Sequence, residues 1–507
     1  MTHILEPARH TPILADADVV VAGGGAAGFA AAVAAAREGA RTVLVEKFGT
    51  LGGCMGTGGW NAGAFSLKDL NFERFRDTHH LSSRTTVDEV DAETMDAIRR
   101  CGIAGEWMAR IIESDEHLGV RQTLGDQANR VAWVCAKMAH EAGVELMLDT
   151  FAADVILEDG QNVTGLMVEN VSGRGAIRAK TVIDATASAN VARRAGAPLV
   201  DGNWQPSMNI TFGFGGGDRA RWQEFAGDRR EVPDEFNRWI DEVLVPDAGY
   251  IWWRLGAHIN RMRPYADLVR RAWEEDGYRA VGRIGDIGII AAAFPDPDAR
   301  MPDEQGMYWG RADMDGKIDT LDAGHMTIVE RDARNYMMDT LRFFRKYLPG
   351  YDNAHLMYLS PYIGTRGGRA IEAERIINED DLFAARRFDD VVATIVDGRC
   401  RDDQPTDIPY RQLLPQRVQN MLAAGVSAHR KPPNLRERTV VINMGQSAGT
   451  AAAIAADDDV QVRDVDVRKL QRRLLDRGIY LGTKPHVEQL LKTPVPSFHQ
   501  THRREVS

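Results

Sequence analysis

Three glycines near the start of the chain have the spacing of a phosphate-binding turn. Gly23, Gly25 and Gly28 form G-x-G-x-x-G directly after the apolar run DVVVA. In such a turn the first glycine permits a tight bend, the second admits a diphosphate to the backbone, and the third lets helix and sheet pack closely. The N–H groups of the following helix, beginning at Ala26 and Ala27, then attract negative charge. The pattern predicts a site for the diphosphate of a dinucleotide.

An acid follows at the distance that such a site requires. Glu46 ends the apolar run RTVLVE, and its carboxylate can accept hydrogen bonds from an adenosine ribose. We include the adjacent Lys47 in the site. A strand at 18–22, an Ala-rich helix at 26–38 closed by Gly39, and a strand at 41–46 would position these groups as a βαβ unit.

The apolar run at 19–36 has two alternative interpretations, a membrane span and a secretory signal. Asp16 and Asp18 precede it where a signal would have basic residues, and Arg37 and Glu38 follow it. Alanine supplies most of its apolar character, which is weak for lipid. The dinucleotide interpretation accounts for more of these residues.

The segment 47–63 is rich in glycine, and its seven glycines include Gly52 and Gly53. Backbone without side chains can lie flat against a large planar ligand. A surface loop is the alternative, but it would expose Leu51, Met55 and Trp60.

Small-residue turns recur after strands in the middle and at the end of the chain. One predicted strand ends at Ala185, Thr186 and Ala187, and another ends at Ala424 and Gly425. The segment 439–456 then opens a second Ala-rich helix, which contains Gly445, Ala448 and Gly449. One domain assembled from these distant pieces would bring the turns together.

With these motifs the chain resembles the FAD-dependent oxidoreductases of the glutathione-reductase-like flavin fold, including fumarate reductase-like and thiazole synthase-like relatives. The resemblance runs from about residue 15 to 460. Its motifs are Gly52-Gly53 with Thr57-Gly58, Ala185-Thr186-Ala187, Ile363-Gly364-Thr365-Arg366, IPYRQLLP at 408–415, and Gly445-Gln446-Ser447-Ala448-Gly449. The chain departs from the family pattern in three places: Ala187 replaces a glycine, Val426 replaces a polar residue, and Gly367-Gly368 replaces Glu-Ser.

The resemblance implies an α/β fold, a Rossmann-like FAD/NAD(P)-binding domain of parallel sheet plus β-meander with an inserted α+β substrate domain. It implies non-covalently bound FAD, with backbone near Ala153 reading the adenine edge. We expect a discontinuous FAD domain at 15–70, 120–200 and 385–470, a helical cap at 71–119, a substrate domain at 201–384, and a C-terminal helix and tail at 471–507. Seven of the ten tryptophans lie between Trp204 and Trp309, which predicts an aromatic core in the substrate domain.

Four residues are candidates for chemistry on the substrate. Arg366, or Arg369 in its place, could pair with a substrate carboxylate or polarise a carbonyl. The alternative is a structural ion pair with Glu372 or Glu374. His429 follows the last flavin strand and could take a hydroxyl proton, or it could be a loop histidine. Tyr362 and Arg436 are further candidates. Cys54 lies in the glycine-rich loop and is interpreted as a packed thiol rather than a redox group.

Two rival functions remain to be weighed. GQSAG also fits the G-x-S-x-G of a hydrolase, with TVVIN as its strand, Ser447 as nucleophile and His486 in the triad. Only 58 residues follow Gly449, too few for the rest of such a fold. An NAD-only dehydrogenase is the other alternative, but it would not need the glycine-rich segment.

Bulk properties restrict the remaining classes. The chain has 507 residues and a net charge of −11, which argues against a nucleic-acid partner. Its four cysteines include no C-x-x-C pair, so we expect a reduced, cytoplasmic protein without a metal site. We expect a small-molecule substrate, an unidentified electron acceptor and no membrane span. A homo-oligomer is left open.

Overall fold

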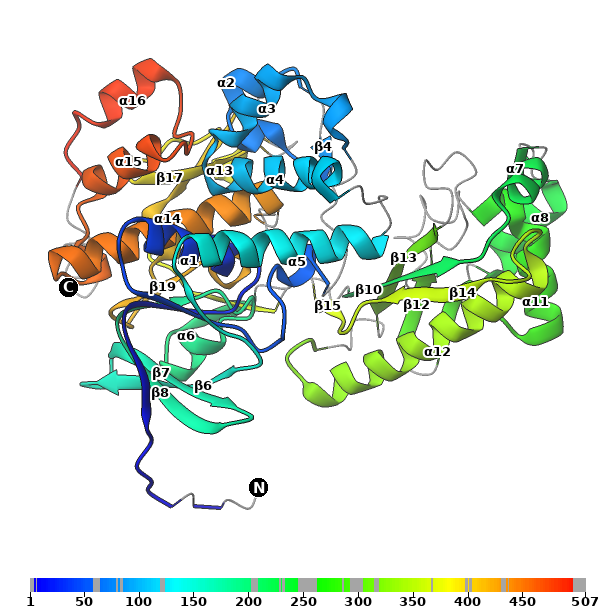
Figure 1. Ribbon diagram of the computed structural model, residues 1–507, viewed down its shortest axis with the longest axis horizontal. Helices are drawn as coiled ribbons and strands as arrows, with labels where there is room; N and C mark the ends of the chain where they lie inside the picture. Colours follow the sequence, from blue (N-terminus) through cyan, green and yellow to red (C-terminus); the bar gives the residue numbers. More distant parts are fainter. Residues whose placement is uncertain are drawn as a thin grey trace.

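The chain forms two lobes, shown side by side in the computed structural model (Figure 1). The structure describes residues 4–5, 7–57, 64–78, 81–82, 85–118, 124–201, 208–227, 229, 233–244, 262–284, 287–291, 304–313, 319–365, 368–396, 400, 404–429, 435 and 437–495. Each lobe has its own cluster of buried apolar side chains. The predicted α/β fold with a flavin-type sheet and an inserted lobe is confirmed.

The first lobe is built on a seven-stranded sheet. Its order is β5-β2-β1-β8-β7-β6, and β19 pairs with β8 beyond the end of β7. β1, β2, β5, β8 and β19 run parallel, while β6, β7 and β8 form the predicted antiparallel meander. The strands are β1 (Ile13–Ala22), β2 (Thr42–Val45), β5 (Glu145–Met147), β6 (Phe151–Glu158), β7 (Asn162–Asn170), β8 (Gly173–Asp184) and β19 (Met421–Ala423).

Four parallel strands end level with one another. Ala22 pairs with Val45 on one side and with Asp184 on the other, and Asp184 pairs with Ala423. The carboxyl ends of β1, β2, β8 and β19 therefore meet at one edge of the sheet, which is where open α/β sheets bind their ligands. Segments about 400 residues apart in the sequence become neighbours there.

Two Ala-rich helices, α1 (Ala26–Arg37) and α14 (Arg438–Asp458), pack on each other. Their approach depends on glycine, since a Cβ at Gly445 would lie 2.1 Å from the Ala27 carbonyl oxygen and one at Gly449 2.1 Å from that of Ala31. The predicted strand TVVIN is wrong, because α14 already begins at Arg438. Gly445 and Gly449 thus lie inside the helix, where they allow close packing rather than opening it.

The remaining elements of the first lobe surround this sheet and helix pair. They are β3 (Ala64–Phe65), α2 (Phe72–Phe75), β4 (Leu81–Ser82), α3 (Ala92–Arg99), α4 (Gly102–Leu118), α5 (Leu124–Glu141), α6 (Asn190–Arg194), β9 (Leu199–Asp201), β16 (Arg369–Ile371), α13 (Glu379–Phe383), β17 (Val391–Ile395), β18 (Thr406–Pro409), α15 (Val467–Asp476) and α16 (Lys484–Leu490). Among the described residues, no helix combines the length and apolar character needed to cross a bilayer.

The second lobe is a six-stranded antiparallel sheet with helices against it. Its strands are ordered β11-β12-β13-β10-β14, and β15 also pairs with β10. Aromatic residues, among them Trp222, Tyr336 and Phe344, fill its core. The elements are β10 (Met208–Gly215), α7 (Arg219–Gly227), α8 (Asp234–Trp239), α11 (Ala266–Asp276), β11 (Val281–Ile284), β12 (Ile287–Ala291), β13 (Glu304–Asp313), α12 (Ala323–Tyr347), β14 (His355–Leu359) and β15 (Gly364–Thr365).

The end of the inserted lobe differs from the expected boundary at residue 384. Ile363 is the last buried residue of the second core, whereas Ile371 and Leu382 already belong to the first. The chain therefore returns to the first lobe between Tyr362 and Arg369, since β16, which begins at Arg369, pairs with β9 of that lobe.

Candidate active site

A cavity of about 960 Å³ lies where the carboxyl ends of the parallel strands face the second lobe. Its wall contains the turns after β1, β2, β8 and β19, the start of α14, the start of α12, and the crossing segment around Tyr362. This volume is at the upper end of the usual range for ligand pockets, about 300–1,000 Å³. It is thus large enough for an extended cofactor.

The turn after β1 has the features of a diphosphate cradle. Gly23 has φ +99°, and a Cβ there would lie 2.5 Å from the Ala185 carbonyl oxygen. Gly25 caps α1 and lines the cavity, and a Cβ there would meet no atom within 4 Å. No side chain caps α1, and no acid lies in its first turn. The N–H groups of Gly23 and Gly24 donate to the Val45 carbonyl and to Glu46, so those at the start of α1, at the lining residues Ala26 and Ala27, are the ones available for an anion.

Gly28 has the packing role that its position in the motif predicts. A Cβ there would lie 1.7 Å from the Gly23 carbonyl oxygen and 3.0 Å from the Ala185 Cβ. It does not line the cavity.

Glu46 lies at the end of β2 and is buried beside this turn. Its carboxylate accepts hydrogen bonds from the N–H of Gly24 at 2.5 Å and of Phe48 at 3.0 Å. Burial raises the pKa of Glu46, partly opposed by these two bonds. Glu46 and Lys47 both line the cavity, so the acid can reach a ribose while it fixes the first turn.

The glycine pair Gly52-Gly53 packs against the first glycine turn. Gly52 N–H donates to the Gly24 carbonyl at 2.9 Å, and a Cβ at Gly53 would lie 3.0 Å from the Gly25 Cα. Both line the cavity. Thr57 does not line it, and its carbonyl accepts a hydrogen bond from the Tyr358 hydroxyl at 3.3 Å.

Asp184 organises the turn after β8, a role that the sequence motifs did not indicate. Its buried carboxylate accepts hydrogen bonds from the backbone N–H groups of Thr186, Val191 and Ala192, each at 2.9 Å. It also accepts from the Ser427 hydroxyl, at 3.1 Å, in the turn after β19. One carboxylate thus holds two of the cavity's turns together.

Ala185, Thr186 and Ala187 line the cavity at this turn. Ala187 has φ +63°, a left-handed conformation that glycine adopts more readily, so the departure from the family pattern carries local backbone strain. Thr150, Phe151 and Ala152 form the wall at the start of β6. Ala153 lies just beyond them, and its carbonyl accepts a hydrogen bond from Arg194 Nε at 2.5 Å.

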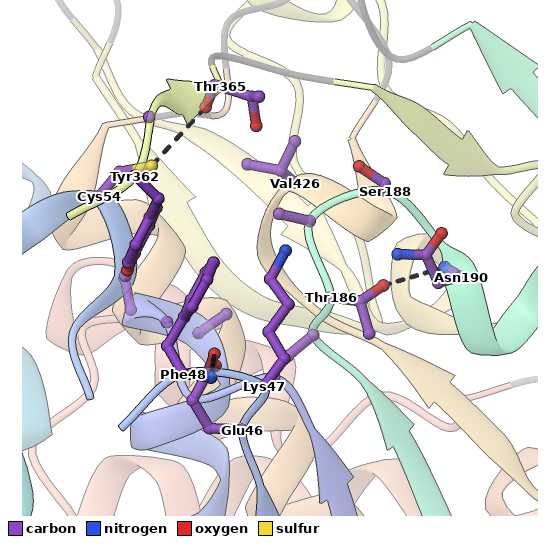
Figure 2. A pocket seen from close by; sticks show the side chains of 18 of the residues that line it. Glu46, Lys47, Phe48, Cys54, Thr186, Ser188, Asn190, Tyr362, Thr365 and Val426 are labelled. Atoms are coloured by element: carbon purple, nitrogen blue, oxygen red, sulfur yellow. Dashed lines mark hydrogen bonds between the residues drawn. The ribbon is translucent and has the colours of Figure 1, made fainter. Parts of the chain in front are cut away.

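The other side of the cavity is formed by the crossing segment and the glycine-rich loop. The Tyr362 ring stacks on that of Phe48, with centroids 3.7 Å apart and planes 8° apart (Figure 2). Burial raises the pKa of Tyr362 far above its ordinary value. Cys54 also lines the cavity, and its Sγ lies 3.7 Å from the Thr365 carbonyl oxygen. All four cysteines are free.

The turn after β19 and the start of α14 close the cavity. Ala424, Val426, Glu437, Arg438 and Val441 line it. The positive end of the α14 dipole therefore faces the cavity from Glu437 and Arg438.

The other predicted cofactor residues of this region lie behind the wall, since Gly425, Gly445, Ala448 and Gly449 do not line the cavity. Gly425 has φ +63°, and a Cβ there would lie 2.7 Å from the Ala27 Cβ. Gly425 therefore allows this turn to pack closely on α1.

The candidates for substrate chemistry are only partly brought together. Tyr362 lines the cavity, whereas His429 is 1% exposed and does not line it. Arg366 and Arg436 lie outside the described residues. The expected structural ion pairs of Arg369 with Glu372 or Glu374 are not formed among the described residues, since Arg369 bonds to the turn after β8 and Glu374 pairs with Arg463.

Several parts of the wall carry no motif that could have predicted them. Asp322, Met326 and Glu330 contribute from the start of α12, and Asn190 from the start of α6. The expected cap at 71–119 contributes no described residue to the cavity; its α4 instead packs against α1 and α14. No group of metal-binding side chains is found among the described residues.

The hydrolase interpretation of GQSAG is wrong, because its serine is not on a strand-to-helix turn. Ser447 is fully buried inside α14, and its hydroxyl lies 2.7 Å from the Val392 carbonyl oxygen and 2.9 Å from that of Asn443.

We expect Ser447→Ala to lower the free energy of unfolding by about 1–3 kcal/mol, since it removes a buried hydrogen bond. Urea unfolding measures this. An ester-cleaving activity that Ser447→Ala abolished would contradict the structural role.

Comparison with known proteins agrees with this geometry. A family model described as FAD dependent oxidoreductase matches residues 18–474. No curated protein matches the sequence.

Among solved structures, the chain is similar to a geranylgeranyl bacteriochlorophyll reductase-like protein from Thermoplasma acidophilum (13% identity, 94% of this chain and 88% of that one, TM-score 0.39). It is also similar to p-nitrophenol 4-monooxygenase from Pseudomonas putida (14%, 97% and 92%, 0.39). At these TM-scores the likenesses say nothing about the substrate. The family match covers nearly the whole chain, which therefore belongs to the FAD-dependent oxidoreductases, enzymes with FAD as cofactor.

Proposed function

We propose that this cavity holds FAD without a covalent bond and that the enzyme moves a hydride between a small polar metabolite and the flavin N5. The observation that carries the proposal is the convergence of four strand ends and the N-termini of α1 and α14 on one cavity. When bound, FAD supplies the electron chemistry. The protein supplies position, charge and protons.

The described residues divide these tasks. The N–H groups at the start of α1, at Ala26 and Ala27, bind the diphosphate, and Glu46 accepts hydrogen bonds from the ribose. The start of α14 presents partial positive charge to the cavity, which favours negative charge on a reduced ring. Only backbone groups are needed there, so small residues suffice.

Protons and substrate charge require side chains. The Tyr362 phenol is protonated at neutral pH even at its ordinary pKa, and burial moves that pKa further upward, so it can donate a hydrogen bond to a substrate oxygen rather than act as a base. We propose Arg366, directly after the lining residue Thr365, and Arg436, directly before Glu437, for pairing with a substrate carboxylate. His429 is the weakest of the four candidates, since its buried ring lies behind the wall.

The direction of transfer and the electron acceptor belong to the same proposal. The enzyme removes hydride and a proton from an alcohol or C–H position, or reduces a double bond in the reverse sense. Oxygen, a quinone, an electron-transfer protein or a nicotinamide can serve as the second redox partner. The free cysteines support a reducing, cytoplasmic setting.

A visible spectrum followed by an anaerobic substrate screen tests the proposal. We expect a yellow protein whose flavin band is bleached by a member of a panel of small hydroxy acids, alcohols and sugars. If none bleaches it, the dithionite-reduced protein should be reoxidised by an unsaturated acid. A colourless protein that FAD does not reconstitute, or a flavin inert to both panels, would contradict the proposed function.

A further inference from the structure

Arg369 reaches the cavity from the strand that leaves the inserted lobe. It begins β16, and its backbone lies opposite that of Asp201 in the neighbouring strand β9. Its Nη2 donates to Asn190 Oδ1 at 2.9 Å, and its Nε donates to the Ser188 carbonyl at 3.3 Å. The guanidinium is therefore fixed to the turn after β8 while its side chain lines the cavity.

Among the side chains that the structure describes, no carboxylate lies within ion-pair distance of the Arg369 guanidinium. Burial and then the positive charge of Arg193 lower the pKa of Arg369, and Arg194 lowers it further, while the negative charges of Asp319 and Asp184 oppose this. Arg193 and Arg194 do not line the cavity, but their positive charges act on Arg369 and favour an anionic ligand near it.

The turn that holds Arg369 packs directly on the diphosphate cradle. Ala185 N–H donates to the Ala22 carbonyl at 2.9 Å, and a Cβ at Gly23 would lie 2.5 Å from the Ala185 oxygen. Ser188 and Asn190 follow within the same turn, and both line the cavity together with Gly25. Figure 2 shows Thr186, Ser188 and Asn190 on one side of the cavity, opposite Phe48 and Tyr362.

We propose that Arg369 is a cofactor-binding residue whose guanidinium pairs with the diphosphate of FAD. The inference rests on the proposal that this cavity is the FAD site. The backbone turn supplies only partial charges, and Arg369 adds a full positive charge for a doubly negative diphosphate in a cavity that Lys47 also lines. The strand that ends the inserted lobe thereby becomes part of the cofactor site.

Binding of three ligands to the full-length apoprotein separates this role from the alternatives. We expect Arg369→Gln to weaken FAD and ADP binding about tenfold to hundredfold, the effect of one charge-assisted pair, and to flatten the salt dependence of both. Adenosine carries no phosphate, so its affinity should stay unchanged. Arg369→Lys keeps the charge but loses the fork geometry, and we expect an intermediate affinity. Isothermal titration calorimetry measures all three ligands.

Arg386→Gln is the matched control. Arg386 is half-exposed, pairs with Asp381 at 2.6 Å and does not line the cavity, so its loss changes the net charge and removes one ion pair away from the cavity. Unchanged FAD and ADP affinities in Arg369→Gln would overturn the inference and favour a substrate anion as the partner. An equal loss of adenosine binding would overturn it in favour of a structural role. Wild-type protein that binds no FAD would instead refute the site itself.

Discussion

Gly25→Asp is expected to give a folded protein that does not hold FAD. Gly25 has φ −70°, an ordinary conformation for any residue, and a Cβ there would meet no protein atom within 4 Å. The aspartate would instead extend into the cavity beside the N-terminus of α1, where it occupies the diphosphate position with a like charge. We expect the FAD affinity to fall by more than a hundredfold, with the free energy of unfolding of the apoprotein within about 0.5 kcal/mol of wild type.

Gly227→Asp is the control, since Gly227 at the end of α7 is equally open and lies outside the cavity. It should retain full FAD affinity. Fluorescence titration with FAD and urea unfolding of the apoprotein separate binding from folding. A Gly25→Asp variant that is as yellow as wild type would contradict the assignment of this turn to the diphosphate.

Gly28→Ala, unlike Gly25→Asp, should destabilise the fold itself. Its Cβ would lie 1.7 Å from the Gly23 carbonyl oxygen, an atom of the backbone that cannot rotate away. Alanine normally stabilises a helix interior by about 1 kcal/mol relative to glycine. Here overpacking outweighs that gain, and we expect a loss of about 3 kcal/mol or more in the free energy of unfolding.

Gly227→Ala provides the comparison for this variant, because its Cβ would meet nothing within 4 Å. It should be as stable as wild type or slightly more stable. Urea unfolding of the apoproteins measures both. Equal stability of Gly28→Ala and wild type would mean that α1 does not approach β1 as closely as described.

The sequence predicted the fold well where local chemistry and tertiary structure agree. The βαβ unit around Gly23–Gly28, the meander and the convergence of the distant turns at Ala185 and Ala424 each follow from strand patterns closed by small residues. Because parallel strands place their carboxyl ends at one edge of the sheet, predicting these strands also indicated the edge at which the cavity lies. These motifs predicted a dinucleotide, and the family resemblance that they carry implied FAD.

The start of α14 could not be read from the sequence. TVVIN is rich in β-branched residues, which favour strands, yet it forms the first turns of a helix. A fully buried apolar run has no solvent-facing side and therefore no period that distinguishes helix from strand. Gly445 and Gly449 do not mark the beginning of the helix. They are required by the close contact between α14 and α1.

The rest of the site depends on contacts between segments that carry no motif. Asp184 ties the turns after β8 and β19 together, and the ring of Tyr362 meets that of Phe48 across the two lobes. Neither pairing has a sequence spacing that a local rule could use. The contribution of α12, through Asp322 and Glu330, depends on how the inserted lobe sits against the sheet.

Hydrogen–deuterium exchange of the apoprotein and the FAD-loaded protein tests the central claim most directly. If one FAD occupies the cavity, its binding should slow exchange together in residues 23–29, 46–53, 185–190, 424–428 and 437–441, while α7 and α11 of the second lobe stay unchanged. Protection confined to the first two segments, with none in 424–428 and 437–441, would show that the distant turns do not share one cofactor.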